Sequence, residues 1–402
     1  MRDAARNGAA LDPRGLCVDD GCGMKVCHVI TRMILGGAQE NTILTCEGLH
    51  ARGHQVTLIT GPALGPEGQL MTRARAGGYR VIEIADLRRE IHPLRDRRSY
   101  RELLRCLEEL RPDIMHSHSS KAGVLARKAA GRIGGMKIVH TVHGLPFHRY
   151  LPWWRNWLYV ALERRAARRT DAIISVADAM TRQALAVDVG RSEQYTTIYS
   201  GIEIEPYLTQ PQAAETFRDS LNLPAGDILV TQVSRLAELK GHRYIVKAAE
   251  RMDDRRVHFC FVGDGKWRRR IEADIERRGL TDRFHLTGLL PPEDIPAVMH
   301  ASDVVVHCSL REGLARALPQ AMLAGRPVVS FDVDGAADVV DESTGILLPS
   351  KDAKALADAI DTLLGSSELR RRLGAAGRGK CREIFSHHRM VEQIEKLYRS
   401  LA

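Results

Sequence analysis

Two cations lie close together in the segment SRLAELKGH, at Arg235 and Lys240. The segment follows a run of β-branched residues and precedes a stretch of helical periodicity that begins near Gly241. A helix start offers unpaired backbone N–H groups and the positive end of the helix dipole, so that two nearby cations complete a site suited to a diphosphate. The alternative is an ordinary loop with solvated Arg and Lys side chains.

The segment SLREGLARALPQAMLAGRPVVS carries an acid and an amide with distinct places in the chain. We expect Glu312 and Gly313 in a loop after a buried strand, and Gln320 in the first turn of the following helix with its amide directed at a cleft. A carboxylate there can accept hydrogen bonds from vicinal sugar hydroxyls, and the amide can pair with ribose hydroxyls. Alternatively, Glu312 merely complements the dipole of the helix that follows.

A pair of glycines, Gly36 and Gly37, stands in GGAQENT between an apolar run and a helical stretch. Glycines at this place allow the backbone to approach a phosphate or a sugar closely. A tight turn between strand and helix would explain the same residues without any ligand.

Three histidines lie at the ends of predicted strands: His116 and His118 in HSH, and His143 in HTVHG. The HSH spacing could ligate a metal if a third ligand converged. No third ligand is evident, so we expect His116 and His118 to line the acceptor side of a cleft or to form local hydrogen bonds. His143 is expected to face that cleft.

From Met24 onward, short β-branched runs alternate with longer amphipathic stretches, which predicts an α/β fold with parallel sheets. The pattern restarts after a stretch punctuated by Gly201 and several prolines, so two domains are expected. We predict an irregular extension at 1–23, an N-terminal domain at 24–205, a C-terminal domain at 206–384 and a closing helix at 385–402. Eleven strands are expected, beginning at or near Lys25, Gln55, Tyr79, Asp113, Lys137, Ala172, Asp227, Val257, Arg283, Asp303 and Pro327.

The formal net charge of +9 lies almost entirely between Met24 and Glu205, which suggests an anionic partner or simply a solvated surface. The eight cysteines form no CxxC pair, and no apolar run reaches the roughly 20 residues of a membrane span. A cytosolic protein is therefore expected. Three tryptophans in one predicted helix either anchor that helix in the core, which we favour, or contact the inner face of a membrane: Trp153, Trp154 and Trp157.

The string from Glu312 onward resembles that of the family-4 glycosyltransferases, which have two facing Rossmann-like domains in the arrangement called GT-B. Glu312, Gly313 and the Ala-Met pair at 321–322 match the family pattern. Gln320 departs from it, because the family has a second glutamate there that holds the ribose. Ser200 and Glu203 also depart from the usual Asn-Gly-Ile-Asp.

The resemblance implies a role for each matching residue. Arg235 and Lys240 look like the pair that binds the donor diphosphate, while Glu312 and His143 look like the residues that face the transferred sugar. The other expected donor contacts are Gly36, Gly37, Gly263, Gly288, Gly313, Leu314, Ala315 and Gln320.

The implied reaction is metal-independent transfer of a hexose from a nucleotide diphosphate, with UDP expected, to a glycan, lipid or small molecule, with retention of configuration. Fixed cations would stabilise the departing diphosphate. No D-x-D pair is expected in a metal-binding loop, and no cofactor or nucleic-acid partner is expected. The rival interpretations are a sugar-nucleotide-binding subunit without activity and a sugar-nucleotide epimerase.

Overall fold

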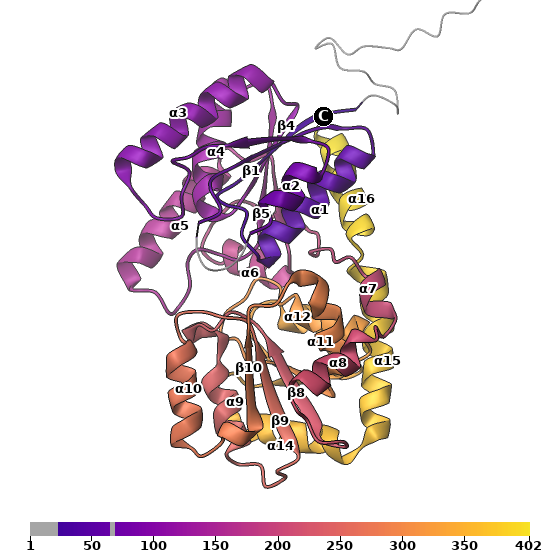
Figure 1. The fold of residues 1–402 in the computed structure, drawn as a ribbon. Helices are drawn as coiled ribbons and strands as arrows, with labels where there is room; N and C mark the ends of the chain where they lie inside the picture. The colour runs from indigo at the N-terminus through magenta and orange to yellow at the C-terminus, as the bar shows by residue number, and fades with distance from the viewer. Residues whose placement is uncertain (1–22, 65–68) are drawn as a thin grey trace, which may run out of the picture.

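The computed structural model describes residues 23–64 and 69–402, so residues 1–22 of the predicted extension lie outside the described part. The chain forms two lobes, each built around one sheet with helices on its faces (Figure 1). Within each sheet, every pair of neighbouring strands is parallel. The predicted fold class, an α/β protein with two Rossmann-like domains, is confirmed.

The N-terminal lobe has a seven-stranded sheet of order β3-β2-β1-β4-β5-β6-β7. Its central strands β1, β4 and β5 are buried along nearly their whole length, because helices cover both faces. The strands are β1 (Lys25–Ile30), β2 (Gln55–Thr60), β3 (Arg80–Glu83), β4 (Ile114–His118), β5 (Lys137–Val142), β6 (Ala172–Ser175) and β7 (Tyr195–Thr197). The helices are α1 (Gly37–Ala51), α2 (Met71–Ala76), α3 (Pro93–Leu110), α4 (Ser120–Ile133), α5 (Trp153–Ala167), α6 (Asp178–Leu185) and the 3₁₀ turn η1 (Ser192–Gln194).

The C-terminal lobe has a six-stranded sheet of order β10-β9-β8-β11-β12-β13. Its strands are β8 (Ile228–Val233), β9 (Val257–Val262), β10 (Phe284–Gly288), β11 (Val304–His307), β12 (Val328–Phe331) and β13 (Gly345–Leu348). Its longer helices are α8 (Ala213–Ser220), α9 (His242–Ala249), α10 (Arg268–Arg277), α14 (Ala353–Gly365) and α15 (Ser367–Ile384), and they are followed by the last helix of the chain, α16 (His387–Leu401). The shorter ones are α7 (Glu205–Leu208), α11 (Ile295–Ala301), α12 (Ala317–Leu323), α13 (Ala336–Val339), η2 (Glu238–Lys240), η3 (Thr281–Arg283) and η4 (Pro292–Asp294).

Two strands were absent from the sequence prediction, and both lie at the edge of a sheet. β7 has only three residues, none of them fully buried, and β13 is buried at its two ends only. An edge strand packs on one neighbour and is often short, so its hydrophobic pattern is too brief to be recognised.

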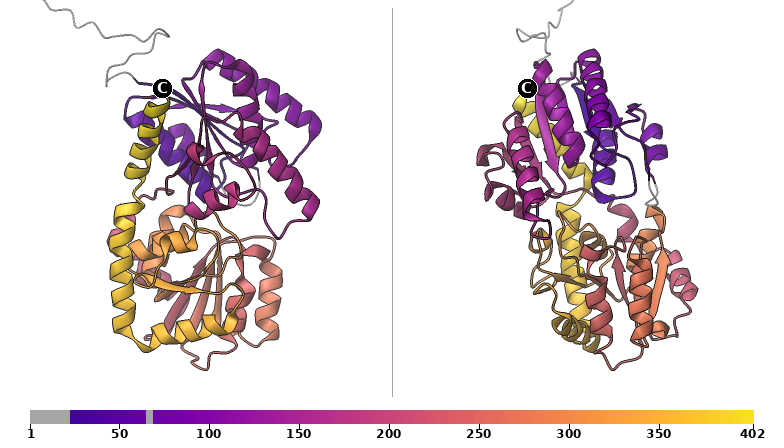
Figure 2. Two further views of the ribbon diagram at one scale, coloured as in Figure 1. Left: turned by 180° about the vertical axis from the view of Figure 1, so that it is seen from behind. Right: turned by 90° about the vertical axis from the view of Figure 1, so that its left-hand side faces the viewer.

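The last helix returns to the N-terminal lobe and packs there, as the two views of Figure 2 show. Met390, Val391, Ile394 and Tyr398 are buried in the core of that lobe. The chain passes between the lobes near Ile202 and again near Phe385. The two passages are joined by a hydrogen bond, in which the Ile202 amide donates to the Phe385 carbonyl at 2.7 Å. Two chain crossings thus lie side by side.

Candidate active site

The carboxyl ends of the two sheets meet at the boundary between the lobes. His143 follows β5, and its carbonyl oxygen would lie 1.9 Å from a Cβ atom added to Gly313, which lies in the loop after β11. Only glycine permits such an approach at position 313. In open parallel sheets, this edge is where ligands bind.

A partly buried ion pair lies on the C-terminal side of this boundary. The Lys240 ammonium donates to Glu312 Oε1, and His307 Nε2 lies 3.0 Å from the same oxygen. Burial acts to raise the pKa of the Glu312 carboxyl, but Lys240 and His307 outweigh it and hold that pKa well below its ordinary value. Glu312 is therefore an ionised acceptor.

The loops that carry Lys240 and Glu312 are held together by one amide side chain. Gln232 Nε2 donates to the Lys240 carbonyl at 3.1 Å, and Gln232 Oε1 accepts from the Cys308 amide at 3.0 Å. Gly241 is required beside them, since its φ is +72° and an added Cβ would lie 1.8 Å from the Cys308 carbonyl oxygen. In the sequence, Gln232 is a polar residue within the apolar run of β8, and its role in this contact was not predicted.

The remaining predicted donor residues of this lobe lie in neighbouring loops at the same sheet edge. Arg235 is exposed in the loop after β8. A Cβ on Gly263 would lie 2.3 Å from the Ser234 carbonyl oxygen, and the Gly263 amide donates to the Gly288 carbonyl at 2.8 Å. The ends of β8, β9 and β10 are thereby brought together.

Arg316 joins the glycine loop of the N-terminal lobe to the C-terminal lobe. Its guanidinium donates to Glu40 Oε2 and to the Gly201 carbonyl, both at 2.8 Å. Gly36 caps α1, and a Cβ on Gly37 would lie 2.7 Å from Arg316 Cδ. Arg316 was not among the predicted site residues, although it stands four residues after Glu312 in the segment SLREGLARALPQAMLAGRPVVS.

A chain of imidazole rings runs inward from His143. His143 Nε2 lies 3.1 Å from His118 Nδ1, and His118 Nε2 lies 2.9 Å from His28 Nδ1. Burial lowers the pKa of His28 and of His143 to about 3, and Arg316 adds to the effect at His143. These rings are neutral at physiological pH.

The expected acceptor-side role of His116 and His118 does not agree with their burial, because both side chains are fully enclosed. Each forms local hydrogen bonds, which was the other expectation. His116 Nδ1 lies 2.5 Å from Tyr398 Oη of α16, and His116 Nε2 lies 2.7 Å from Thr141 Oγ1. Burial holds the pKa of both rings well below the ordinary value.

His28 is a third imidazole beside the HSH pair, contrary to the expectation that none would converge. One nitrogen of each of His28, His116 and His118 lies within 4.8 Å of the others. Of their six ring nitrogens, His28 Nε2 alone lacks a hydrogen-bond partner among the described residues. A metal would therefore have to displace existing hydrogen bonds.

Three predicted donor residues of the segment after β11 have side chains in contact with other parts of the protein. Gln320 Nε2 donates to Tyr207 Oη of α7 at 2.8 Å, so this nitrogen is engaged by the linker between the lobes and not directed at an open cleft as expected. The side chains of Leu314 and Ala315 pack in the apolar cluster shared by the two lobes.

A D-x-D pair, Asp332 and Asp334, follows β12 and was passed over in the sequence analysis. Asp334 Oδ2 accepts from the Glu312 amide at 2.6 Å, and Asp334 Oδ1 accepts from Gln183 Nε2 of the other lobe at 2.9 Å. Both oxygens are thus already used to fix Glu312 against the N-terminal lobe. Asp332 is exposed.

The comparisons with known proteins agree with this architecture. The family described as "Glycosyltransferase Family 4" matches residues 35–206, and "Glycosyl transferases group 1" matches residues 213–380. The chain is 33% identical to the 2-deoxystreptamine N-acetyl-D-glucosaminyltransferase of Streptomyces fradiae over 306 residues, which cover 70% of this chain and 72% of that one.

Two further relatives extend the likeness over nearly the whole chain. The UDP-Gal:alpha-D-GlcNAc-diphosphoundecaprenol alpha-1,3-galactosyltransferase of Escherichia coli is 26% identical over 93% of this chain and 96% of that one. The fold matches Anabaena HepE in complex with UDP-glucose with a TM-score of 0.81, at 24% identity, over 94% of this chain and all of that one. The chain belongs to the family-4 glycosyltransferases, and it is a glycosyltransferase with the GT-B fold.

Proposed function

We propose that this glycosyltransferase moves a hexose from UDP to an acceptor hydroxyl with retention of anomeric configuration. The observation that carries the proposal is that the His143 carbonyl lies against Gly313, the residue after the ionised Glu312, where the two lobes meet. Relatives whose names specify UDP-linked sugars support UDP as the nucleotide.

The residues divide the reaction between them. As the bond to the sugar breaks, negative charge develops on the diphosphate, and in this proposal Arg235 and Lys240 stabilise it. Glu312 accepts hydrogen bonds from hydroxyls of the sugar, and His143 orients the sugar from the opposite lobe. The acceptor hydroxyl attacks from the face that the diphosphate leaves and passes its proton to the departing phosphate oxygen, so neither residue forms a covalent bond with the sugar.

The proposed mechanism assigns no step to a metal or a cofactor. Fixed cations beside the diphosphate perform the charge stabilisation that a metal ion supplies in other transferases. Turnover measured in excess EDTA is therefore expected to equal turnover in buffer, and loss of turnover that added Mg²⁺ or Mn²⁺ restores would contradict this.

The acceptor is proposed to be a glycan or a lipid-linked sugar. The relative from Escherichia coli carries a diphosphoundecaprenol acceptor in its name. Among the described residues, no helix is long and apolar enough to cross a bilayer.

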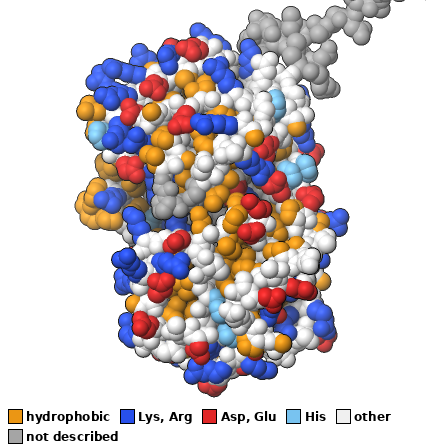
Figure 3. Space-filling view, in the orientation of Figure 1, with side chains coloured by type: hydrophobic (Ala, Val, Ile, Leu, Met, Phe, Trp, Pro, Cys, Tyr) orange, Lys and Arg blue, Asp and Glu red, His pale blue; other side chains and the backbone are white. Residues whose placement is uncertain are grey.

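Peripheral contact with a membrane's inner face is proposed through α5. Trp153, Trp154 and Trp157 are 81%, 50% and 69% exposed, whereas the helix buries Glu163 and two alanines. The favoured expectation that the tryptophans anchor a core helix is therefore wrong. Hydrophobic side chains gather where Figure 1 places α5, with basic side chains beside them (Figure 3). Aromatic rings flanked by cations suit an anionic lipid interface.

The reaction is tested by incubating the purified chain with UDP-glucose, UDP-galactose and UDP-N-acetylglucosamine and with lipid and glycan extracts. We expect one donor to yield a product whose anomeric configuration, determined by NMR, equals that of the donor. An inverted product would refute the retaining mechanism. Absence of both transfer and slow donor hydrolysis would favour the binding subunit, and release of an epimerised nucleotide sugar would favour the epimerase.

Membrane contact is tested by sedimentation with vesicles of phosphatidylcholine and phosphatidylglycerol. The wild-type chain is expected to bind at low salt, and replacement of the three α5 tryptophans by serine is expected to abolish binding. The matched control is Trp267→Phe in the other lobe. Failure of the wild-type chain to sediment at low salt would remove this part of the proposal.

A further inference from the structure

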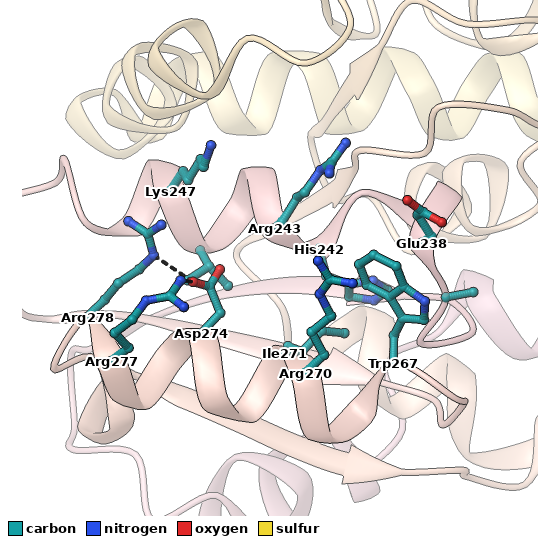
Figure 4. A pocket seen from close by; sticks show the side chains of 12 residues that line it. Glu238, His242, Arg243, Lys247, Trp267, Arg270, Ile271, Asp274, Arg277 and Arg278 are labelled. Carbon is teal, nitrogen blue, oxygen red and sulfur yellow. Dashed lines mark hydrogen bonds and ion pairs between the residues drawn. The ribbon is translucent and has the colours of Figure 1, made fainter. Parts of the chain in front are cut away.

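A groove of about 320 Å³ lies between α9 and α10 (Figure 4). Five of its lining side chains are cationic and two are acidic. The cations come from both helices and are Arg243, Lys247, Arg270, Arg277 and Arg278. Positive charge gathered in a concave site favours an anionic ligand.

Some of this charge is already neutralised within the groove. Asp274 accepts from Arg277 and from Arg278, the latter at 3.1 Å, and Arg278 also pairs with Glu250. These two arginines therefore contribute little net charge.

The other three cations have no such neutralisation. Arg243 and Arg270 lie over aromatic rings of the chain, at 4.8 Å from the Tyr244 centroid and 4.4 Å from the Trp267 centroid. Neither they nor Lys247 form an ion pair with any carboxylate of the described residues. Packing on the rings holds the two guanidinium groups in place without cancelling their charge.

A buried histidine without a full set of partners lies at the wall of the same groove. His242 is only 2% exposed, and its Nδ1 atom has no hydrogen-bond partner among the described residues. Burial lowers the pKa of His242 to about 3, and Lys240 and His307 add to this, so the ring is neutral.

The hydrogen bonds around His242 allow its proton to lie on Nδ1. Gln232 Nε2 donates to Ser234 Oγ at 3.1 Å, and the Ser234 hydroxyl can donate to His242 Nε2 at 3.3 Å. In that tautomer Nδ1 carries the proton of the neutral ring and is a buried donor that needs an acceptor.

We propose that the groove between α9 and α10 binds a small phosphate-bearing anion, with Arg243, Lys247 and Arg270 holding its charge and His242 Nδ1 donating to one of its oxygens. The volume suits a diphosphate or the phosphate of a monosaccharide. The site is separate from the proposed donor site, yet Gln232 connects its wall to the Lys240 carbonyl.

The test is calorimetric titration of the full chain with inorganic pyrophosphate at low salt. We expect two sites per chain in the wild type, one at the donor loop and one in the groove. Lys240→Ala should remove the first and keep the second, while Arg243→Glu/Lys247→Glu should remove the second and keep the first. The matched control, Arg251→Glu/Arg255→Glu, changes the net charge equally at exposed positions outside the groove and should keep both sites.

The two proposals can fail separately. A single site that is lost in Lys240→Ala and kept in the groove variant would overturn the inference and leave the donor site intact. A single site with the opposite behaviour would support the groove and contradict the donor site. Lys247→Ala, a milder change, serves if the double variant fails to fold and should weaken groove binding at least several-fold.

Discussion

The two sheet edges that face each other at the lobe boundary use opposite electrostatics. On the N-terminal side, His28 and His143 have pKa values lowered to about 3 by burial, so their chain of rings is neutral. On the C-terminal side, Glu312 stays ionised because Lys240 offsets the cost of its burial. Burial thus removes charge where no counter-charge is at hand and keeps it where one is. One edge suits the orientation of hydroxyls, the other the binding of a charged leaving group.

The largest effect on turnover is expected from substitutions of the ion pair at the edge of the C-terminal sheet. Lys240→Ala and Glu312→Ala should each lower kcat by about a hundredfold or more, because each removes electrostatic stabilisation or positioning of the transition state. Turnover of the proposed donor, measured with circular dichroism as a check on folding, tests this. Glu238→Ala, on the same loop as Lys240, is the control and should retain activity. Near-normal turnover in either Ala variant would contradict the assigned roles.

A smaller effect on turnover is expected from substitutions in the chain of neutral histidines at the edge of the N-terminal sheet. His118 lies behind His143 and acts only through it, so His118→Ala should lower kcat by about tenfold and leave the donor KM nearly unchanged. His118→Gln, which can still hydrogen-bond, should recover part of the loss. The control is His258→Ala, a partly buried histidine of the other lobe. An equal loss in the Ala and Gln variants would show that a hydrogen bond at this position is unimportant.

As pH falls from neutral, the first loss of stability should come from the buried histidines at the edge of the N-terminal sheet. Since the folded pKa of His28 lies below its unfolded value of 6.5, the unfolded chain binds protons that the folded chain does not as pH falls below 6.5. Each such histidine should lower the free energy of unfolding by about 1.4 kcal/mol for each pH unit below 6.5. Glu312 has a lowered pKa and loses its stabilising contribution only as pH falls below about 4.5, the ordinary value.

Urea unfolding at pH 7.5, 6.5 and 5.5 measures this effect. The wild type should be most stable at the highest of these values and lose stability below pH 6.5. His28→Leu, which fills the same strand position without a titratable ring, should flatten the dependence. A stability that rises as pH falls from 6.5 to 5.5 is incompatible with a neutral histidine chain.

The smallest effect is expected at Gln320, where the family has a glutamate. Because Gln320 is engaged with Tyr207, and a carboxylate could accept from the same hydroxyl, Gln320→Glu should change the donor KM by about threefold or less. Steady-state kinetics with the proposed donor measures this, with Tyr207→Phe as the matched control. A KM lowered by orders of magnitude would show that residue 320 reaches the ribose directly.

The fold was predictable because buried parallel strands are continuous apolar runs, which explains why β1, β2 and β5 have the expected bounds. The loops after these strands were predictable as site positions, since the carboxyl ends of parallel strands share an edge. Lys240 and Glu312 could be chosen on these grounds, although nothing in their spacing shows that they form an ion pair.

Other features depend on contacts between distant segments. His28 is one polar residue within an apolar strand and gains meaning only because β1 lies beside β4, 90 positions from His118. Arg316 meets Glu40 only because the two lobes face each other. The exposure of the α5 tryptophans depends on which side of the helix packs on the lobe, and their aromatic character favours burial and exposure at an interface alike.

Local hydrophobic patterns suffice to predict the class of fold, the order in which the strand-forming segments follow one another, and the residue types available at the sheet edges. The tertiary structure decided which side chains meet across the lobes, which of them keep their charge and which aromatic rings stay in solvent. Those outcomes depend on desolvation and on pairing over long stretches of chain, which no local pattern records.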